Sequence, residues 1–513
     1  MKIKKVFHKG CVFCLFSTSV CGFSALGLAD EPVLDDTPTR VQTSLAVAME
    51  EVGTLRPKTV NEIETSQWTL GCETMDREYT NYDRFKEYLP QLGIKRIRLQ
   101  AGWARTEKDK GIYDFAWLDY VINDATSRGL EIWLETSYGN PIYPGGGGRT
   151  LADGFPTSAE ALAAWDNWVT QMAKRYKGKV RDWCVWNEPD LNPNNSPERT
   201  AEFCIRTAEI IKREIPEARI AALAICTPNL NYIEPFLQKV KEENKLDLFH
   251  WVVYHQYTMN PDDQEYYKKV QLAREFVAKN APDIKLWEGE SGTQSEWCRS
   301  GAISRYAWSE LTQAKWALRR MLADIGHGVD SFIFSAVDLD YRTTSFHNGI
   351  TRYGLIKTAG AAQGYKVLKV KQAYYAVQNL VSVFNDALQW DENFLTDSSL
   401  TIDCERDLAV YCHRDKASGT PMIVFWDRTD VPGLSNETVP VTLTLKDPGF
   451  KEPVWCDLLT GNVYAVSPDS IVRDGDTITF KSLPAYDSPV FLTSREILTL
   501  DYSDRVLFLR EKK

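Results

Sequence analysis

The chain has 513 residues, of which 43% are hydrophobic, 25% charged and 12% aromatic, so its composition is that of a folded protein with a large core. The formal net charge of -10 argues against nucleic acid as a partner, because that ligand is bound mainly by Lys and Arg at its phosphates. The length suggests two or more domains, or one large barrel with a companion domain.

The first 29 residues have the pattern of an export signal. Four lysines precede an apolar run over residues 11–28, and residues 27–29 form a small-x-small cleavage site. We therefore expect a signal peptide over 1–29 and a periplasmic or secreted protein. Lipid anchoring at Cys21 is the less favoured alternative, because Val20 is too bulky for the position before a lipoprotein cysteine. No later apolar stretch reaches the roughly 20 residues of a membrane span.

Cysteine and histidine give no sign of a metal or cofactor site. The chain has only six histidines, and the cysteines after the signal form no C-x-x-C pair. We predict buried free thiols and neither a metal ion nor a cofactor. A disulfide between Cys404 and Cys412 is left open.

Short apolar runs alternate with longer helical patterns over residues 67–380, which is typical of repeated βα units. One predicted helix begins with the capping box Thr157-x-x-Glu160, and its apolar stripe, from Leu162 to Tyr176, should face the sheet. The candidate strands are Gln67–Cys72, Ile94–Leu99, Leu130–Thr136, Val180–Trp186, Ile220–Ile225, Phe249–Tyr254, Ile284–Gly289 and Val329–Ser335. This number of strands over this length predicts an α/β fold, a (β/α)8 TIM barrel.

The remaining segments predict a second domain. Residues 381–513 contain short alternating strands separated by turn residues, as in an antiparallel β-sandwich. The candidate strands are Leu408–Cys412, Met422–Trp426, Val439–Leu445, Thr477–Phe480 and Val490–Leu492. Residues 30–66 are a lead-in segment that we expect to add an edge strand to this sandwich.

Two of the predicted barrel strands end in carboxylates. The fourth opens into Asn187-Glu188-Pro189, and the seventh ends in Glu288-Gly-Glu290. Active sites of such barrels lie at the carboxyl ends of the strands. A pair of carboxylates facing each other there fits glycosidic bond cleavage, since one can protonate the leaving oxygen while the other meets the sugar carbon. A glutamate at a strand end can also simply cap a helix or pair with an arginine.

The ordered set of motifs over residues 68–380 resembles the clan A glycoside hydrolases, most closely family 39 and its relatives. These motifs are Leu92–Arg98, Trp103–Glu107, Gly111–Phe115, Trp183–Asp190, His255–Tyr257, Trp287–Gly292, Tyr353–Ile356 and Ala373–Ala376. The resemblance implies that Glu188 is the general acid/base, that Asn187 binds the hydroxyl next to the reacting carbon, and that Glu290 is the nucleophile. Glu288 is the rival nucleophile, because strict alternation places it on the same strand face one layer deeper.

The same resemblance implies further binding residues. Arg98 would hold the nucleophile as an anion, with Arg96 as the alternative. Tyr257 would touch the nucleophile and His255 the substrate. The expected ring platforms for the sugar are Trp103 and Tyr138.

One residue departs from the clan pattern. Phe334 stands where many members have a Trp that floors the subsite beside the scissile bond, so the subsite floor is expected to differ.

The function that follows is a retaining β-glycoside hydrolase acting on a carbohydrate substrate such as β-glucan or xylan-type chains. Two alternatives stay open, namely a non-catalytic carbohydrate-binding barrel and a transglycosylase that uses the same residues. The loops over 139–156 and 294–305 are expected to decide whether the site is a groove or a pocket.

Overall fold

The computed structural model describes residue 41 and residues 45–342 and 349–501 of the chain. The predicted signal peptide, residues 1–29, lies outside the described residues. Within the described ranges, no helix combines the length and the hydropathy that crossing a bilayer requires.

A parallel barrel forms the first part of the structure. Within the described residues its eight strands are hydrogen-bonded in the order β8-β7-β6-β5-β4-β3-β2-β9. The strands are β2 (Trp68–Gly71), β3 (Arg96–Gln100), β4 (Glu131–Thr136), β5 (Asp182–Val185), β6 (Arg219–Ile225), β7 (Trp251–His255), β8 (Lys285–Glu290) and β9 (Ser331–Ile333). A parallel bridge between Trp287 and Asp330 joins β8 to β9 and closes the ring. Each predicted strand is present, so the predicted TIM barrel is confirmed.

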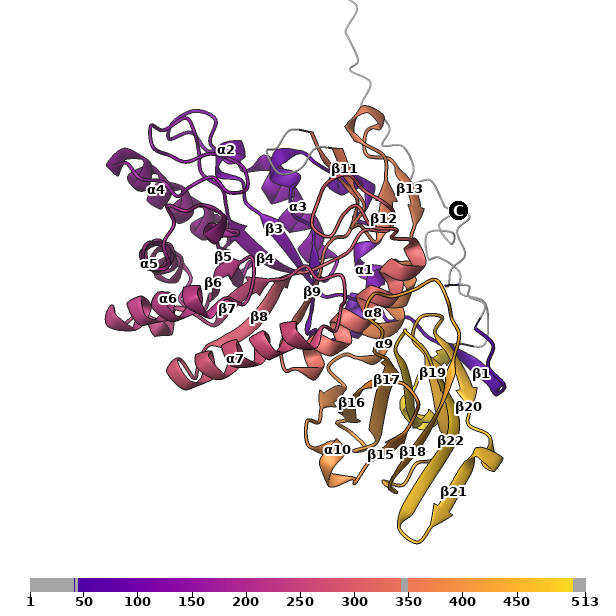
Figure 1. The fold of residues 1–513 in the computed structure, drawn as a ribbon. Helices are drawn as coiled ribbons and strands as arrows, with labels where there is room; N and C mark the ends of the chain where they lie inside the picture. The colour runs from indigo at the N-terminus through magenta and orange to yellow at the C-terminus, as the bar shows by residue number, and fades with distance from the viewer. Residues whose placement is uncertain (1–40, 42–44, 343–348, 502–513) are drawn as a thin grey trace, which may run out of the picture. The chain divides into compact units, whose positions relative to one another are not determined.

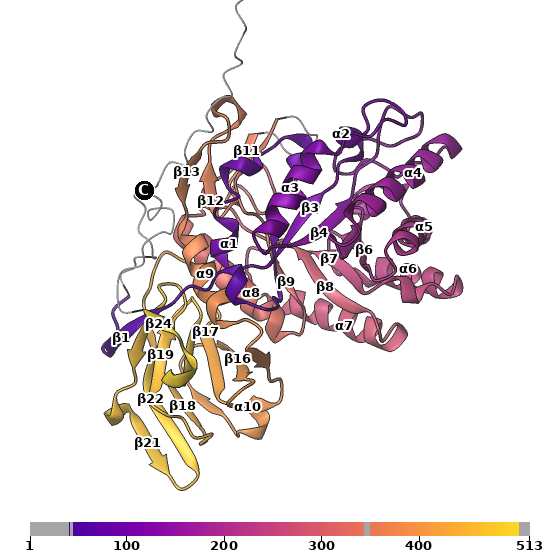
Figure 2. The ribbon, with the colours of Figure 1, turned by 180° about the vertical axis from the view of Figure 1, so that it is seen from behind.

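Helices lie around the outside of the strands (Figures 1 and 2). They are α3 (Ala116–Ser127), α4 (Ala159–Tyr176), α5 (Pro197–Glu214), α6 (Leu230–Glu242), α7 (Gln264–Asn280), α8 (Glu310–Gly326) and α9 (Gln372–Val383), with the short α1 (Leu89–Leu92) and α2 (Trp103–Thr106). The N-cap residue predicted for α4, Thr157, is wrong by one residue. Ser158, not Thr157, caps the helix by accepting from the Ala161 N–H at 3.1 Å. The apolar stripe is buried except for Leu162, which is half-buried.

The interior of the barrel is filled by large side chains. Trp133 and Trp287 stack with ring centroids 4.3 Å apart, and the Arg96 guanidinium lies 4.9 Å from the Trp287 ring. Arg96 also pairs with Asp182 at 3.2 Å. Arg96 is therefore part of the packed interior, which removes it as the alternative to Arg98 beside the nucleophile.

Two short antiparallel pairs follow the barrel. They are β10 (Leu339–Tyr341) with β11 (Gly349–Thr351), and β12 (Ile356–Thr358) with β13 (Val367–Val370).

The C-terminal region is an antiparallel β-sandwich, as predicted, with two sheets in the described part of the chain. The larger sheet has the order β14-β16-β17-β23-β19-β20-β1-β24, and the smaller has β15-β18-β22-β21. Their strands are β1 (Glu50–Leu55), β14 (Leu388–Trp390), β15 (Thr401–Asp403), β16 (Leu408–Asp415), β17 (Pro421–Asp427), β18 (Val439–Lys446), β19 (Pro453–Asp457), β20 (Asn462–Ala465), β21 (Ile471–Asp474), β22 (Thr477–Ala485), β23 (Val490–Ser494) and β24 (Leu500–Asp501), with the short helix α10 (Phe394–Asp397).

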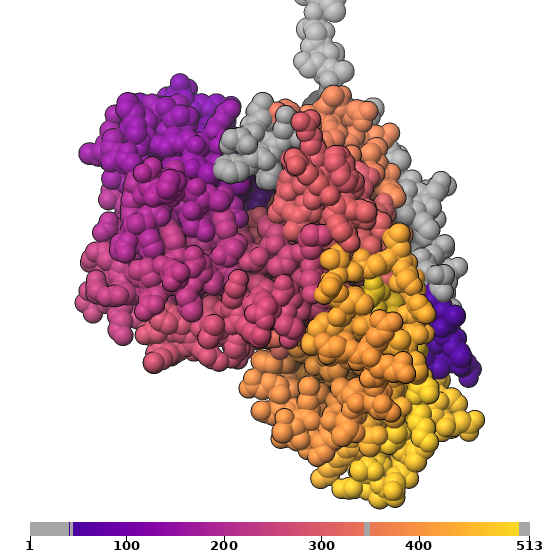
Figure 3. Space-filling view, viewed as in Figure 1, coloured from indigo at the N-terminus to yellow at the C-terminus, as the bar shows by residue number. Residues whose placement is uncertain are grey.

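One strand of the sandwich comes from the lead-in segment. β1 pairs with β20 on one side and with β24 on the other. The expectation that the lead-in segment adds a strand to the sandwich is confirmed, but the expectation of an edge strand is wrong, because β24 pairs with the other side of β1. Figure 3 shows the indigo residues of this strand beside the orange and yellow residues of the C-terminal region. Cys404 and Cys412 are both free, so the disulfide left open between them is not formed.

Candidate active site

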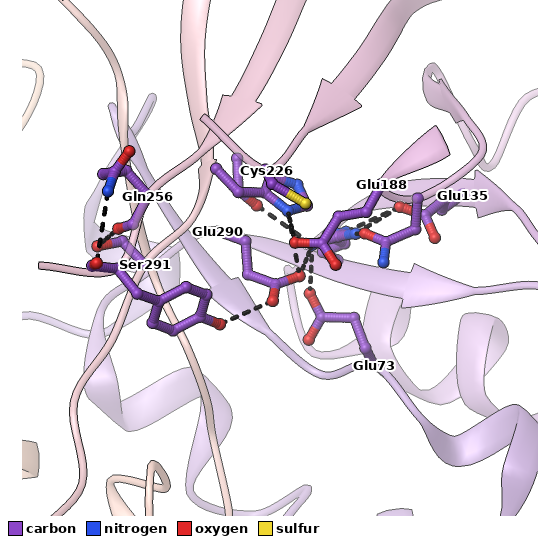
Figure 4. A network of polar contacts seen from close by, with 12 residues as sticks. Glu73, Glu135, Glu188, Cys226, Gln256, Glu290 and Ser291 are labelled. Atoms are coloured by element: carbon purple, nitrogen blue, oxygen red, sulfur yellow. Dashed lines mark hydrogen bonds and ion pairs between the residues drawn. The ribbon is translucent and has the colours of Figure 1, made fainter. Parts of the chain in front are cut away.

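The two predicted catalytic glutamates meet at the carboxyl end of the barrel. Glu290 is the last residue of β8, and Glu188 follows β5 with a left-handed φ of 47°. One oxygen of Glu188, one oxygen of Glu290 and a ring nitrogen of His255 all lie within 4.8 Å of one another. Figure 4 shows both carboxyl groups turned toward the same space. The short distance is close to the roughly 5 Å that allows one carboxylate to attack while the other protonates.

A bulge in β8 separates Glu290 from its rival. Tyr254 is opposite Glu288 and His255 is opposite Glu290, so Gly289 is an extra residue in the ladder. A Cβ on Gly289 would lie 2.2 Å from a Val253 methyl, which only glycine avoids. The prediction that Glu288 shares the face of Glu290 is therefore wrong, because the bulge interrupts the alternation.

Glu288 lies on the outer side of the barrel wall. It is fully buried, and its carboxyl oxygens have no hydrogen-bond partner among the described residues. Burial and the charge of Asp324 on α8 raise the pKa of Glu288 well above its usual value, although Arg320 opposes them. Its surroundings are those of a protonated structural group.

Glu290 is surrounded by groups that favour its charged form. Arg98 Nη1 lies 2.7 Å from one carboxyl oxygen, and the Tyr257 hydroxyl donates to the other at 2.7 Å. Burial pushes the pKa of Glu290 upward, but His255, Arg98 and Tyr257 outweigh it, so the pKa is lowered from 4.5. A carboxylate that stays ionised is suited to nucleophilic attack.

The pKa of Glu188 is displaced in the opposite direction to that of Glu290. Burial and the charge of Glu290 raise the pKa of Glu188 above 4.5, while the contact of its carboxyl oxygen with His255 Nδ1 at 3.1 Å opposes them. Two adjacent carboxyl groups with pKa values displaced in opposite directions have the properties of an acid and a nucleophile.

Arg98 is the buried centre of this network. Besides Glu290, its guanidinium contacts Glu135 at 2.5 Å and Glu73 at 3.1 Å, and it donates to the Asn187 side-chain oxygen at 2.5 Å. Asn187 in turn donates to the Tyr138 hydroxyl at 2.8 Å. One guanidinium therefore orients the nucleophile and the amide predicted to bind sugar.

A cavity of about 370 Å³ lies over these groups. Among the predicted residues, its lining includes Tyr138, Asn187, Glu188, Tyr257, Glu290 and Phe334. Arg98 and His255 are buried beside Glu290 and do not line it. Leu151 and Gly301 bring both of the predicted loops to the cavity wall.

Trp103 is not a sugar platform. Its side chain is 0% exposed and stacks on the rings of Tyr143 and Trp168, with centroids 5.6 and 5.9 Å away. Its indole N–H donates to Glu107 at 2.5 Å. The prediction is wrong because Trp168 of α4 stacks on Trp103 and Tyr143, from the loop between β4 and α4, stacks on it as well.

Several polar residues of the site were not found from the sequence. Glu73 follows the first barrel strand, Gln100 ends the second and Glu135 lies near the end of the third. The rule that identified Glu188 and Glu290, polar residues at strand ends, applies equally to these three. Cys226 also lines the cavity and directly follows β6, so the same rule points to it. Arg77, the last residue of the 3-10 helix Met75–Arg77, lines the cavity without such a signal. A second cavity of about 530 Å³ shares Arg77 and Tyr138 with the first, so the site extends beyond the glutamate pair.

Among the described residues, Glu188, His255 and Glu290 are also close enough to offer three ligand atoms to a cation. Both oxygens of Glu290 already accept hydrogen bonds from Arg98 and Tyr257. This hydrogen bonding fits a catalytic pair better than a metal site, because a ligating oxygen would have to give up its donor.

The resemblance to clan A glycoside hydrolases implies a barrel with one glutamate after strand four and another at the end of strand seven, followed by a β-sandwich. The structure has this arrangement. A family model described as beta-galactosidase, glycoside hydrolase family 42, matches residues 74–145. A family 39 glycoside hydrolase from the gut symbiont Bacteroides cellulosilyticus WH2 superposes with a TM-score of 0.60 at 16% identity, covering 86% of this chain and 83% of that one.

Two further solved structures are similar in fold. A monomeric beta-xylosidase from Caulobacter crescentus CB15 has a TM-score of 0.54 at 16% identity, with 86% of this chain and 97% of that chain covered. A family 30 subfamily 8 xylanase from Clostridium acetobutylicum has a TM-score of 0.51 at 12% identity, with coverages of 88% and 98%. The predicted resemblance to clan A, and to family 39 within it, is confirmed at the level of the fold.

Proposed function

We propose that this protein is a retaining β-glycoside hydrolase. The observation that carries the proposal is the pair Glu188 and Glu290, whose nearest oxygens lie within 4.8 Å in one cavity and whose pKa values are displaced in opposite directions. This separation leaves no room for a water molecule to attack between carboxylate and sugar, as inverting enzymes require.

The reaction proceeds in two displacements. Glu290 attacks the anomeric carbon while the bond to the leaving oxygen breaks, and Glu188 gives its proton to that oxygen. Glu188 then takes a proton from water, the water oxygen bonds to the anomeric carbon, and the ester to Glu290 breaks. Arg98 and Tyr257 stabilise the Glu290 carboxylate before and after each cycle.

The substrates in this proposal are β-linked glycans, with xylan-type chains and β-glucans first. A beta-xylosidase and a xylanase among the similar structures support this choice. Against a plain β-xylosidase, Phe334 lines the cavity where many clan members have Trp, so the subsite floor differs. The proposal includes export by the predicted signal peptide, which cell fractionation of the full-length chain would test.

Kinetics of the Glu188→Ala variant test the proposal. With unactivated aryl β-xylosides and β-glucosides, we expect hydrolysis to fall by about 10² to 10⁴-fold, because general acid catalysis is lost. With a 2,4-dinitrophenyl leaving group, which needs no proton, the first step should survive and azide should restore turnover. A binding protein would show no turnover in either form.

Trapping identifies the nucleophile directly. A 2-deoxy-2-fluoro glycoside should label the peptide that contains Glu290, and NMR should show release of the β-anomer first. Label on another residue, or release of the α-anomer, would contradict the mechanism. Product analysis with and without an acceptor sugar separates hydrolysis from transglycosylation.

A further inference from the structure

A third carboxyl group, that of Glu73, lies in the active-site cavity and has no part in the mechanism above. The first barrel strand ends at Gly71, and the Glu73 side chain folds back over this glycine. A Cβ on Gly71 would lie 2.6 Å from Glu73 Oε2 and 2.8 Å from the Phe334 ring. Glycine at 71 therefore makes room for the Glu73 carboxyl beside Phe334, and Figure 4 shows this group turned toward Glu290.

The hydrogen bonds around Arg98 distinguish its three carboxyl neighbours. Glu290 accepts from Arg98 and Tyr257. Glu135 accepts from Arg98, from Gln100 at 2.9 Å and from Ser137 at 2.8 Å. Glu73 has only the 3.1 Å ion contact with Arg98, and neither of its oxygens has a hydrogen-bond partner in another described residue.

The charge balance decides which of the three carries a proton. Among the described ion pairs, Arg98 is the one cation beside Glu73 and Glu135, and it is shared with Glu290, which also faces His255. A proton is therefore most stable on the carboxyl group with the fewest donors. That group is Glu73. Burial raises its pKa to about 8, Arg98 opposes this, and the charges of Glu290 and Glu135 add to it.

A protonated carboxyl has one donor and one acceptor side by side, which matches a sugar hydroxyl that also donates and accepts. A polar group that faces a cavity without a protein partner bonds to water in the free protein and is available to a ligand that displaces this water. We propose that Glu73, in its protonated form, binds one hydroxyl of the sugar held against Glu290 through two hydrogen bonds. This inference rests on the proposed function and specifies its substrate class as a glycoside with an uncharged glycone, since a sugar carboxylate here would meet three acidic groups.

A double-mutant cycle tests the inference, with the Glu73 substitution as one change and the removal of one substrate hydroxyl as the other. Wild type and Glu73→Ala are compared on an aryl β-glycoside and on analogues that lack the hydroxyl at C3, C4 or C6. Glu73→Ala should lower kcat/KM on the parent about 30-fold, and for one deoxy position the loss seen in wild type should vanish in the variant. Glu73→Gln, which keeps a donor and an acceptor, should stay within about threefold of wild type on the parent.

The matched control is Glu107→Gln, a buried glutamate bonded to Trp103 and Tyr143 outside this cavity. This variant should lower the melting temperature. The loss of kcat/KM caused by removing each substrate hydroxyl, called the deoxy penalty below, should be the same as in wild type. Glu73→Met, which has a similar volume but no polar oxygen, gives the same cycle if Glu73→Ala does not fold.

Equal deoxy penalties in wild type and in the Glu73 variants would overturn the inference and leave the proposed function standing, provided that turnover depends on Glu290. Absence of turnover that depends on Glu290 would overturn both. The two failures are therefore distinguishable.

Discussion

Glu288 and Glu290 lie two residues apart on β8 but in different regions of the molecule. Glu288 lies in the layer between β8 and α8, whereas Glu290 lies at the mouth of the barrel, and their carboxyl groups have opposite properties. The Glu288 side chain is buried without a hydrogen-bond donor, whereas Glu290 is 15% exposed and accepts from Arg98 and Tyr257. Burial favours the protonated form in both places. The comparison teaches that donors and access to the cavity, not burial, distinguish the two glutamates.

The layer behind β8 is a polar network of its own. Burial raises the pKa of Asp324 on α8 to about 6, against the influence of Arg320, Ser331 and Tyr267. Tyr267 and Ser331 both donate to Asp324, at 2.8 and 2.7 Å. These contacts join α8 to β9 through Ser331 and to α7 through Tyr267, and none of these residues lines the cavity.

The largest expected effect is the loss of the nucleophile. Glu290→Gln should lower kcat by about 10⁴-fold or more, because the covalent intermediate cannot form. Glu288→Gln, the matched control two residues away, should keep kcat within about threefold, since a protonated carboxyl and an amide are similar in shape and charge. Steady-state kinetics at pH 6 measures both. Comparable losses in the two variants would mean that the two sides of β8 are not functionally distinct.

The next effect concerns the guanidinium shared by the three carboxyl groups. Arg98→Met should destabilise the protein by about 3 to 5 kcal/mol, because it leaves buried carboxylates without their counter-charge, and activity should be lost with it. Arg96→Met is the control, since Arg96 pairs with Asp182 in the barrel interior. Urea unfolding should show lower stability for both variants, but only Arg98→Met should abolish turnover under conditions where the variant is folded.

A smaller effect is expected from the hydroxyl that donates to the nucleophile. Tyr257→Phe removes a hydrogen bond to a charged group, worth about 1.5 to 3 kcal/mol, so kcat/KM should fall by roughly 10 to 100-fold. The same bond lowers the pKa of Glu290, so the acidic limb of the kcat/KM profile should move to higher pH. An unchanged acidic limb would show that this limb does not report Glu290.

The smallest expected effect is the contribution of Glu288 to the pH dependence of the free energy of unfolding. A carboxyl whose pKa is raised by folding stabilises the native state most below its unfolded pKa, and that contribution is lost as the pH rises through the folded pKa. Because the pKa of Glu288 is raised, wild type should lose stability between pH 5 and pH 8. Glu288→Gln should lose less over the same interval, as measured by urea unfolding. A steeper loss in the variant would contradict the assignment.

The sequence was sufficient for the strands and for the residues at their ends, because hydrophobic runs and strand termini are local features. Glu188 and Glu290 were identified this way, and Glu73 obeys the same rule. The bulge at Gly289 arises from pairing with β7, so the strand's own residues do not reveal it. The burial of Trp103 likewise depends on Trp168, which lies far along the chain. Contacts between distant elements therefore account for both errors at the site.

The strand β1 has a consequence for how the protein is made. Its partners Asn462–Ala465 in β20 and Leu500–Asp501 in β24 follow far along the chain, so the larger sheet cannot be completed before these strands have been synthesised. A gene fragment beginning at residue 381 would encode a sheet with β20 as an open edge, ready to pair with another copy. The sandwich is thus not a contiguous cassette that can be moved to another protein by itself.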